Sequence, residues 1–577
     1  MPGSKPQFRD IETVRDVACT LSDGTKLYAD IYRPAGGGRF PVLVNRTPYN
    51  KGAAQAYAYA HPVWYARHGY VVVVQDTRGR WRSDGEFYPV RNEASDGVEV
   101  VAWAADLPHS NGRVGLYGYS YVGLAQLLTA ARRPPALGAI APAFTGSDHY
   151  SNWTYNNGAF SLGFNAWWTL LLGQDTARRR GQRALEQQLG SAARRISDHC
   201  WTLPLGEFLP SSELRSVAPY YYDWLAHPRR DTYWQQMSPQ ERYDDIAVPA
   251  FHIGGWYDTF VEGTLRNFTN LACRMADRRH EQRLVVGPWY HNPWASLVGQ
   301  TDFGPEAAGR VDDHQLKWFD RWLKDAETDL DDLPPVQIFV MGENAWRSGH
   351  EWPPASVSYV DCYLHSAGRA NSISGNGALS HDPPGDEWPD VFMYDPRDPV
   401  PSLGGRSCCV AELTPMGPAN QRPIAVRNDV LVYATGPLQH DVEVTGPVTA
   451  TLWASSTAPD TDFTVTLVDV HPSGCSINLC DGIVRARYRD SMIDPQPLVP
   501  GEAYRFEIQV GSTSNLFRRG HRIGVLVSSS NFPTYDRNAN TGSDPGDVVQ
   551  DELTVATQTI FHDSRRVSLV RLPVIPR

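Results

Sequence analysis

The chain has 577 residues, of which 41% are hydrophobic, and a formal net charge of -11. Single hydrophobic cores stop growing at roughly 250–300 residues, so this length predicts two or three domains. The acidic charge argues against a nucleic-acid partner and leaves a small molecule as the expected one. No stretch approaches the ~20 apolar residues of a membrane helix, and residues 1–10 lack the apolar core of a secretory signal. We therefore expect a cytoplasmic protein without membrane contacts.

The N-terminal part alternates short apolar strands with helical segments. Residues 14–34 predict two strands around a tight turn at Asp23-Gly24, because glycine accepts the positive φ of such a turn. Short apolar runs buried on both faces are typical of a mainly parallel sheet covered by helices. The further expected strands are 41–44, 71–74, 114–117, 250–254, 284–286 and 336–341, and the expected helices are 93–105, 124–131 and 313–324.

Residues 146–245 interrupt this pattern and predict an inserted helical cap. Within the cap, residues 175–189 predict one exposed helix, and the basic run 178–180 is expected to be a solvated face. From about residue 351 the pattern changes to short strands of period 2, separated by Pro and Gly turns. We expect an α/β domain formed by residues 1–145 and 246–350, the cap, and a C-terminal β-sandwich of jelly-roll type over 351–577. The clearest strands in that region are 448–454, 463–467, 504–510 and 523–527.

A serine flanked by glycines lies between an expected strand and an expected helix. Ser120 follows the strand at 114–117, with Gly118 two residues before it and Gly123 three residues after it. This layout is typical of a nucleophile elbow, the strand-to-helix turn that exposes the catalytic serine of an α/β-hydrolase. The general pattern has glycine two residues after the serine, where this chain has Val122. The motif alone is therefore about equally compatible with an ordinary tight turn.

Two further residues complete a triad in the chain order that this fold requires. Asp258 follows the expected strand 250–254, and His291 follows the expected strand 284–286. A lone Asp or His on a loop is more often a turn former, but both lie just past a strand and in the right order. We predict Ser120 as the nucleophile, His291 as its general base and Asp258 as the residue that orients the imidazole. This mechanism needs no metal and no organic cofactor.

Five segments of the chain carry a family resemblance. They are Arg46-Thr47-Pro48-Tyr49, Gln75-Asp76-Thr77-Arg78-Gly79, Gly118-Tyr119-Ser120-Tyr121-Val122-Gly123, Gly255-Trp256-Tyr257-Asp258 and Gly287-Pro288-Trp289-Tyr290-His291. With them the chain resembles, over nearly its whole length, the cocaine esterase branch of the X-prolyl dipeptidyl peptidase family of α/β-hydrolases. In that family, tyrosine after the serine and glycine at the third position, as here, are the usual form of the elbow. The resemblance implies an α/β-hydrolase domain interrupted by a helical cap and followed by a jelly roll.

The resemblance also implies an oxyanion hole and an acyl-binding pocket. Tyr49 would donate its hydroxyl to the oxyanion beside the backbone N–H of Tyr121. Trp168 and Phe260 would contact the acyl group, and Cys408 and Cys409 stand where the family places an apolar pair from its β domain. Together with Trp153, the aromatic residues of the cap favour an aryl or bulky acyl group. From composition alone, Cys408 and Cys409 are expected to be apolar filler or surface thiols, because eight cysteines form neither a disulfide framework nor a zinc motif.

The predicted function is hydrolysis of a small-molecule carboxylic ester through an acyl-enzyme on Ser120. An acyltransferase or a cyclising enzyme would use the same triad and exclude water, and sequence does not separate these activities. By the same resemblance, amide or peptide hydrolysis is less favoured. Related amino-acid ester hydrolases hold a substrate ammonium with a carboxylate cluster that we do not find in this chain, and dipeptidyl peptidases usually carry an N-terminal helical domain, for which there is no room before the first expected hairpin. A binding protein with an inert hydrolase scaffold is disfavoured by the intact triad. The oligomeric state stays open, with a homodimer as one candidate.

Overall fold

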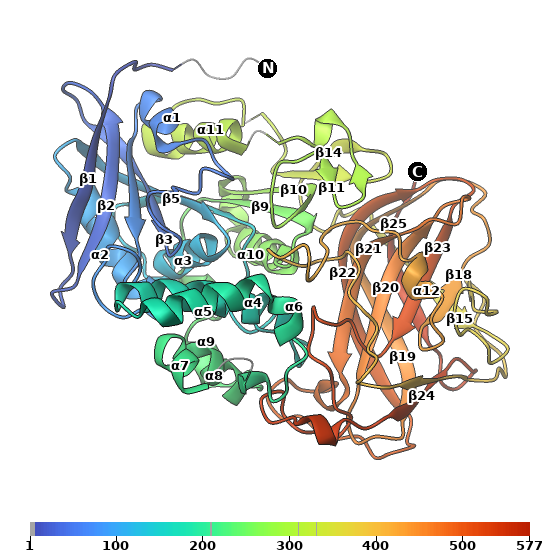
Figure 1. The fold of residues 1–577 in the computed structure, drawn as a ribbon. Helices are drawn as coiled ribbons and strands as arrows, with labels where there is room; N and C mark the ends of the chain where they lie inside the picture. Colours follow the sequence, from blue (N-terminus) through green and yellow to red (C-terminus); the bar gives the residue numbers. More distant parts are fainter. Residues whose placement is uncertain (1–5, 208–210, 310, 331) are drawn as a thin grey trace.

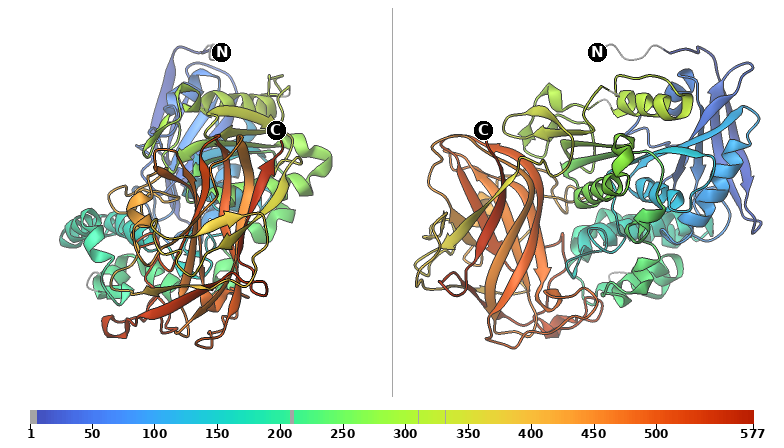
Figure 2. Two further views of the ribbon diagram at one scale, coloured as in Figure 1. Left: turned by 90° about the vertical axis from the view of Figure 1, so that its right-hand side faces the viewer. Right: turned by 180° about the vertical axis from the view of Figure 1, so that it is seen from behind.

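The computed structural model describes residues 6–207, 211–309, 311–330 and 332–577. An α/β region, coloured blue to yellow-green in Figure 1, lies beside a C-terminal all-β region, coloured mainly orange. A group of helices extends from the α/β region toward the lower part of the all-β region. Figure 2 shows the two regions from the side and from behind, and the β-bridge between Asp258 and Ser407 shows that they are in contact.

The α/β region is built on one twisted sheet. Seven neighbouring strands run parallel to one another, namely β4, β3, β5, β6, β9, β10 and β13. At the edges, β1 and β2 on one side and β14 on the other add antiparallel pairs. The predicted hairpin and the predicted parallel strands are confirmed. In spatial order the strands are β1 (Ile11–Thr20), β2 (Lys26–Pro34), β4 (Val71–Asp76), β3 (Phe40–Thr47), β5 (Ser110–Tyr119), β6 (Leu137–Ala143), β9 (Ala250–Tyr257), β10 (Gln282–Tyr290), β13 (Val336–Val340) and β14 (Ala345–Gly349).

Helices cover both faces of this sheet. Because side chains alternate along each strand, a strand contributes residues to the cores on both faces. Val71 and Val73 pack in a core with side chains of α2, α3 and α10, whereas Val72 and Val74 pack with α1 and α11 on the opposite face. This is why the strands read as unbroken apolar runs. The helices are α1 (Pro62–Arg67), α2 (Glu93–Ala105), α3 (Tyr121–Ala130), α10 (Val261–Arg274) and α11 (Val311–Lys324).

The helical group lies between β6 and β9 in the chain. The prediction of one exposed helix over 175–189 is wrong, because α4 ends at Arg179 and α5 begins at Arg183. Gly181 has φ 71° and its N–H bonds to the carbonyl of Arg178, a left-handed turn that ends a helix. Asp175 is buried. The helices are α4 (Leu162–Arg179), α5 (Arg183–Arg194), α6 (Ile196–His199), α7 (Ser211–Val217), α8 (Pro219–Ala226) and α9 (Thr232–Gln235).

The C-terminal region is all β, and the four strands predicted there are confirmed. Its long strand β19 pairs with β22, β24 and β25. In spatial order the strands are β17 (Asp390–Tyr394), β24 (Ala556–Phe561), β19 (Val442–Ser456), β25 (Leu569–Ile575), β15 (Ser358–His365), β16 (Ala378–Ser380), β18 (Leu431–Ala434), β23 (Arg522–Ser528), β20 (Asp462–Val470) and β21 (Ser476–Arg485), with β22 (Tyr504–Phe517) on β19.

Polar contacts join the all-β region to the first turn of α10. The carboxylate of Glu262 accepts hydrogen bonds from the backbone N–H of Ser512 at 2.5 Å and from its hydroxyl at 3.0 Å. Arg406 pairs with the same carboxylate at 2.8 Å. One residue further along, Ser407 forms a β-bridge with Asp258. The loop that carries Asp258 is therefore fixed from both regions.

Among the helices in the described ranges, none has both the length and the apolar character needed to cross a bilayer.

Candidate active site

Ser120 lies at a sharp turn between β5 and α3. Its backbone has φ 63° and ψ -130°, a conformation rarely adopted by residues with a side chain. A Cβ on Gly118 would lie 2.3 Å from Cγ1 of Val122, and a Cβ on Gly123 would lie 2.7 Å from the side chain of Thr145. The glycines are therefore required by close packing. Val122 is tolerated where the general pattern has glycine, because its side chain occupies the space that Gly118 leaves.

Asp258 and His291 follow the neighbouring parallel strands β9 and β10. Parallel strands end at the same edge of a sheet, so the two loops meet. Glycines again allow the approach. A Cβ on Gly255 would lie 2.2 Å from the carbonyl oxygen of Trp289, and one on Gly287 would lie 2.4 Å from the Trp289 ring. The Gly-Trp-Tyr and Gly-Pro-Trp-Tyr sequences before the acid and the histidine thus pack the two strand ends around one buried tryptophan.

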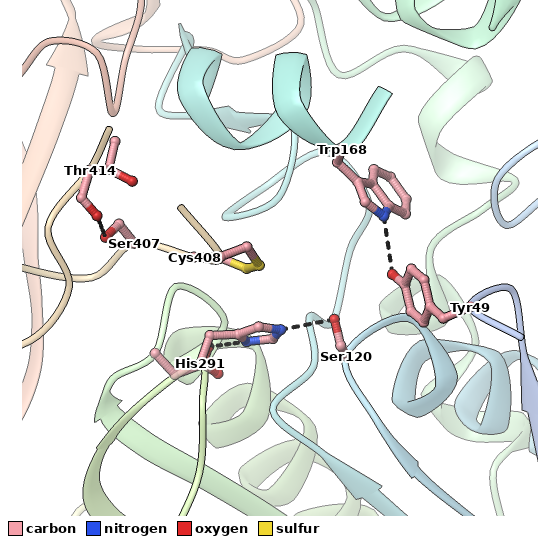
Figure 3. Close-up of a disulfide and its surroundings, with 9 residues drawn as sticks. Tyr49, Ser120, Trp168, His291, Ser407, Cys408 and Thr414 are labelled. Carbon is pink, nitrogen blue, oxygen red and sulfur yellow. Dashed lines mark hydrogen bonds and ion pairs between the residues drawn. A yellow bond between two sulfur atoms is a disulfide. The ribbon is translucent and has the colours of Figure 1, made fainter. Parts of the chain in front are cut away.

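The structure brings the three predicted triad residues into one hydrogen-bonded chain. His291 Nε2 lies 3.0 Å from Oγ of Ser120, and His291 Nδ1 lies 2.7 Å from Oδ1 of Asp258. Figure 3 shows the imidazole directed at the serine hydroxyl. All three side chains are buried, with Asp258 at 0% exposure. In this geometry the imidazole can accept the serine proton while the carboxylate stabilises the resulting imidazolium.

The two residues predicted for the oxyanion hole lie next to this chain. Tyr121 is the first residue of α3, where backbone N–H groups have no partner within the helix. The hydroxyl of Tyr49 accepts a hydrogen bond of 3.1 Å from the indole N–H of Trp168 and lies close to Ser120 (Figure 3). Burial raises the pKa of Tyr49, so this phenol keeps its proton at neutral pH and can donate it.

A buried arginine that sequence reasoning missed holds the Tyr49 loop against the cap. Arg80 is 2% exposed and donates to the carbonyl of Pro48 at 3.0 Å and to the carbonyl of Leu172 in α4 at 2.7 Å. It also lies 3.4 Å from the carboxylate of Asp175. The motif beginning at Gln75 precedes this residue directly. Its position directly after a family motif could have indicated a role for this residue. Its hydrogen-bonding partners could not be predicted, because they lie in segments that are distant in the sequence.

A cavity of about 680 Å³ opens above Ser120 and His291. Its main wall is one face of α4, because the lining residues of that helix recur at spacings of three and four. Helical periodicity could have found this wall from sequence. From α4 these residues are Phe164, Trp167, Trp168, Leu171, Gln174, Asp175 and Arg178; the other lining residues are Tyr49, Tyr57, Arg80, Trp81, Tyr119, Ser120, Glu186, His291, Asn292, Cys409 and Met416.

The five predicted substrate-binding residues occupy two different positions. Trp168 and Cys409 line the cavity. Trp153 and Phe260 lie behind its wall, with ring centroids 4.4 Å apart, and Phe260 packs edge-on against His291 at 5.2 Å. Cys408 is buried beside the imidazole of His291 (Figure 3). Direct substrate contact is therefore supported for two of the five residues, and the other three shape the wall from behind.

Cys408 and Cys409 are joined by a disulfide, so the prediction of filler or surface thiols is wrong. The pair lies in a loop in which Cys409 has φ 79°. One donor atom each from His291, Cys408 and Cys409 lies within 4.8 Å of the others. A soft metal ion would require reduction of the disulfide to bind there, since thiolates are the metal ligands.

Comparisons with known proteins agree with this architecture. Residues 23–293 match the X-Pro dipeptidyl-peptidase (S15 family), and residues 328–571 match the X-Pro dipeptidyl-peptidase C-terminal non-catalytic domain. The chain is 39% identical over 575 residues to the cocaine esterase of Rhodococcus sp. (strain MB1 Bresler), an alignment that covers 97% of this chain and 98% of that protein.

Solved structures show the same fold over the full length. An aminopeptidase from the marine sediment archaeon Thaumarchaeota archaeon superposes with a TM-score of 0.84 at 25% identity, covering 99% of this chain and 98% of that one. A selenomethionine-labelled α-amino acid ester hydrolase superposes with a TM-score of 0.79 at 24% identity and the same coverage. The chain therefore belongs to the X-Pro dipeptidyl-peptidase (S15) family and is a serine hydrolase with an α/β-hydrolase domain and a C-terminal all-β domain.

Proposed function

We propose that this enzyme is a serine esterase that hydrolyses a small carboxylic ester with an aryl or bulky acyl group. The observation that carries the proposal is the hydrogen-bonded chain from Asp258 through His291 to Ser120. The identity of 39% to a cocaine esterase favours an ester as the substrate. The reaction uses side chains and backbone groups of the chain itself and requires no cofactor.

The reaction proceeds through an acyl-enzyme. His291 takes the Ser120 proton as Oγ attacks the ester carbonyl, and it returns that proton to the departing alkoxide. A water molecule then loses its proton to His291 and attacks the acyl carbon, and Ser120 leaves with that proton. Asp258 fixes the tautomer in which Nδ1 carries hydrogen and Nε2 is free to accept.

Negative charge on the tetrahedral intermediate is stabilised by the Tyr49 hydroxyl and the backbone N–H of Tyr121. Trp168 donates its indole N–H to the Tyr49 oxygen, which leaves the phenolic hydrogen free to point at the oxyanion. Such donors in a water-poor site stabilise developing charge at little reorganisation cost. Trp168 therefore links the acyl-binding wall to the oxyanion hole.

The α4 wall supports a flat or bulky acyl group. Trp168 stacks between Phe164 and Trp224, with interplanar angles of 13° and 7°, so its ring presents a fixed surface to the cavity. Asp175, one of two carboxylates that line the cavity, is paired with Arg80 and Arg178. Asp175 is therefore not free to bind a substrate ammonium.

The first test is turnover of p-nitrophenyl butyrate by the wild type, by Ser120→Ala and by Ser95→Ala, an exposed helical serine. We expect Ser120→Ala to lower kcat by about 10⁴-fold or more and Ser95→Ala to have no effect. A fluorophosphonate should label the wild type and not Ser120→Ala. Unchanged turnover in Ser120→Ala would refute the proposal and support the binding-protein alternative.

A second test addresses the acyl group and the fate of the acyl-enzyme. Trp167→Ala removes a cavity-lining ring and should raise KM for p-nitrophenyl benzoate by roughly tenfold, with a smaller change for the butyrate. Trp322→Ala, on α11, is the control. Product analysis with and without an added alcohol or amine separates hydrolysis from acyl transfer. Dominant transfer in dilute nucleophile would favour an acyltransferase.

Three further features of this enzyme are proposals that rest on the sequence. The domain limits are 1–145 with 246–350 for the catalytic domain, 146–245 for the cap and 351–577 for a jelly roll. The enzyme is cytoplasmic. A homodimer is the oligomeric state to test first, by light scattering.

A further inference from the structure

Two histidines and an aspartate gather at the end of a strand pair in the C-terminal all-β domain. Val470, the last residue of β20, pairs with Arg522, the first residue of β23. His471 and His521 are the next residues on either side and continue this register. Because side chains alternate along a strand, Asp469 and His471 project to the same face, and His521 is their cross-strand neighbour. Strand geometry alone therefore brings the three side chains together.

The contacts among these residues form a compact donor set. His521 Nδ1 lies 2.8 Å from Oδ1 of Asp469, and His471 Nε2 lies 3.7 Å from Oδ2 of the same carboxylate. The two imidazole centroids are 4.4 Å apart. The Asp469 side chain is 8% exposed, His521 is 17% exposed and His471 is 39% exposed. The carboxylate is thus anchored within the domain, while the imidazoles reach solvent.

We propose that Asp469, His471 and His521 bind a divalent transition-metal ion such as Zn²⁺ or Ni²⁺. One donor atom from each residue lies within 4.8 Å of the others. Metal–donor bonds of about 2.0–2.2 Å in a tetrahedron place neighbouring donors roughly 3.3–3.6 Å apart. The distances of 2.8 Å to Oδ1 and 3.7 Å to Oδ2 of Asp469 lie on either side of this range, so rotation of the side chains is needed to bring one donor of each residue to a common ion. Water would occupy the fourth position.

A metal ion at this cluster would be bound by the neutral imidazoles of His471 and His521 and by the carboxylate of Asp469. A divalent cation would compensate the negative charge of Asp469, whose side chain is only 8% exposed, and would replace the contact between Asp469 and His521.

The test is titration of the full chain with Zn²⁺ by isothermal calorimetry. The Cys408→Ser, Cys409→Ser background removes thiolate binding beside His291. In that background we expect one Zn²⁺ per chain, with an affinity at least ~10-fold weaker in the His471→Gln, His521→Gln variant. His440→Gln, an exposed histidine of the same domain, is the matched control and should bind as the parent does. Co²⁺ should give a visible ligand-field absorption in the parent and lose it in the double variant.

Turnover of p-nitrophenyl butyrate, compared with that of the Cys408→Ser, Cys409→Ser parent, checks that each histidine variant is folded, because Asp469, His471 and His521 do not line the cavity above Ser120. The single variant His471→Gln changes the most exposed ligand and serves if the double variant is unstable. Equal Zn²⁺ binding by parent and histidine variants would overturn the proposal. Failure of the parent to bind either Zn²⁺ or Ni²⁺ would overturn it as well.

Discussion

The floor and the walls of the cavity are held by different forces. On the floor, Ser120 and His291 sit at the ends of parallel strands, and hydrogen bonds and glycine contacts fix them. The α4 wall is held by ring stacking around Trp168, and the opposite wall contributes Cys409 from a loop of the all-β domain. Hydrogen-bond geometry tolerates little displacement, whereas apolar walls accept changes in side-chain shape. In the proposed function, the residues of the floor therefore carry out the reaction and the residues of the walls select the acyl group.

The largest loss of kcat is expected from a substitution in the cavity floor. Asp258→Asn should lower kcat by about 10⁴-fold, because an amide favours the wrong imidazole tautomer and does not stabilise the imidazolium. Turnover of p-nitrophenyl butyrate measures this loss. Asp302→Asn, at an exposed residue of the short strand β12 (Thr301–Asp302), is the control and should leave kcat unchanged. A loss below tenfold in Asp258→Asn would assign Asp258 a structural role only.

The oxyanion hole should be the next most sensitive feature. Tyr49→Phe removes one donor to the oxyanion and should lower kcat by about 10²–10³-fold, with little change in KM. Steady-state kinetics with the butyrate ester separates the two parameters. Tyr57→Phe changes a tyrosine in the same cavity and should stay near wild type. If KM rises and kcat is kept, Tyr49 binds the ground state instead.

The ion pair of Arg80 with Asp175, which joins the Tyr49 loop to α4, should contribute to the free energy of unfolding. Asp175→Asn leaves the Arg80 guanidinium, which is 2% exposed, without its carboxylate, and should destabilise the enzyme by about 3 kcal/mol. Glu86→Gln breaks a surface pair with Arg180 and should cost at most about 1 kcal/mol. Urea unfolding monitored by tryptophan fluorescence compares the two variants. Equal midpoints would show that Arg80 is held by its carbonyl partners alone.

Substitutions in the loop that carries Cys408 and Cys409 should have the smallest effect on turnover and should act mainly on the selectivity between acyl groups. Replacing both Cys408 and Cys409 by serine should change the benzoate-to-butyrate ratio of kcat/KM by less than ~10-fold and keep kcat for the butyrate within about twofold. Reduction of the wild type by a thiol should produce a change of the same sign. Complete inactivation by either treatment would instead make the loop part of the catalytic floor.

Sequence reasoning succeeded where local pattern and chain order carry the information. The strands around Ser120, Asp258 and His291 are short apolar runs, and their order fixes which loops meet. It failed at Gly181, where a single left-handed residue divides two helices, although glycine after a basic turn was a usable signal. It also missed Arg80 and the disulfide. Their partners depend on the packing of distant or tightly turned segments, which periodicity does not encode.

The contacts of Glu262 and Ser407 have a consequence for engineering heat resistance. Through them, the loop that bears Asp258, the proposed catalytic acid, takes part of its support from the all-β domain. Melting of that domain would release the acid even while the parallel sheet stayed intact. The temperature of inactivation is then set by the less stable of the two domains. Substitutions that stabilise only the more stable domain would raise the melting temperature of that domain and leave the temperature of inactivation unchanged.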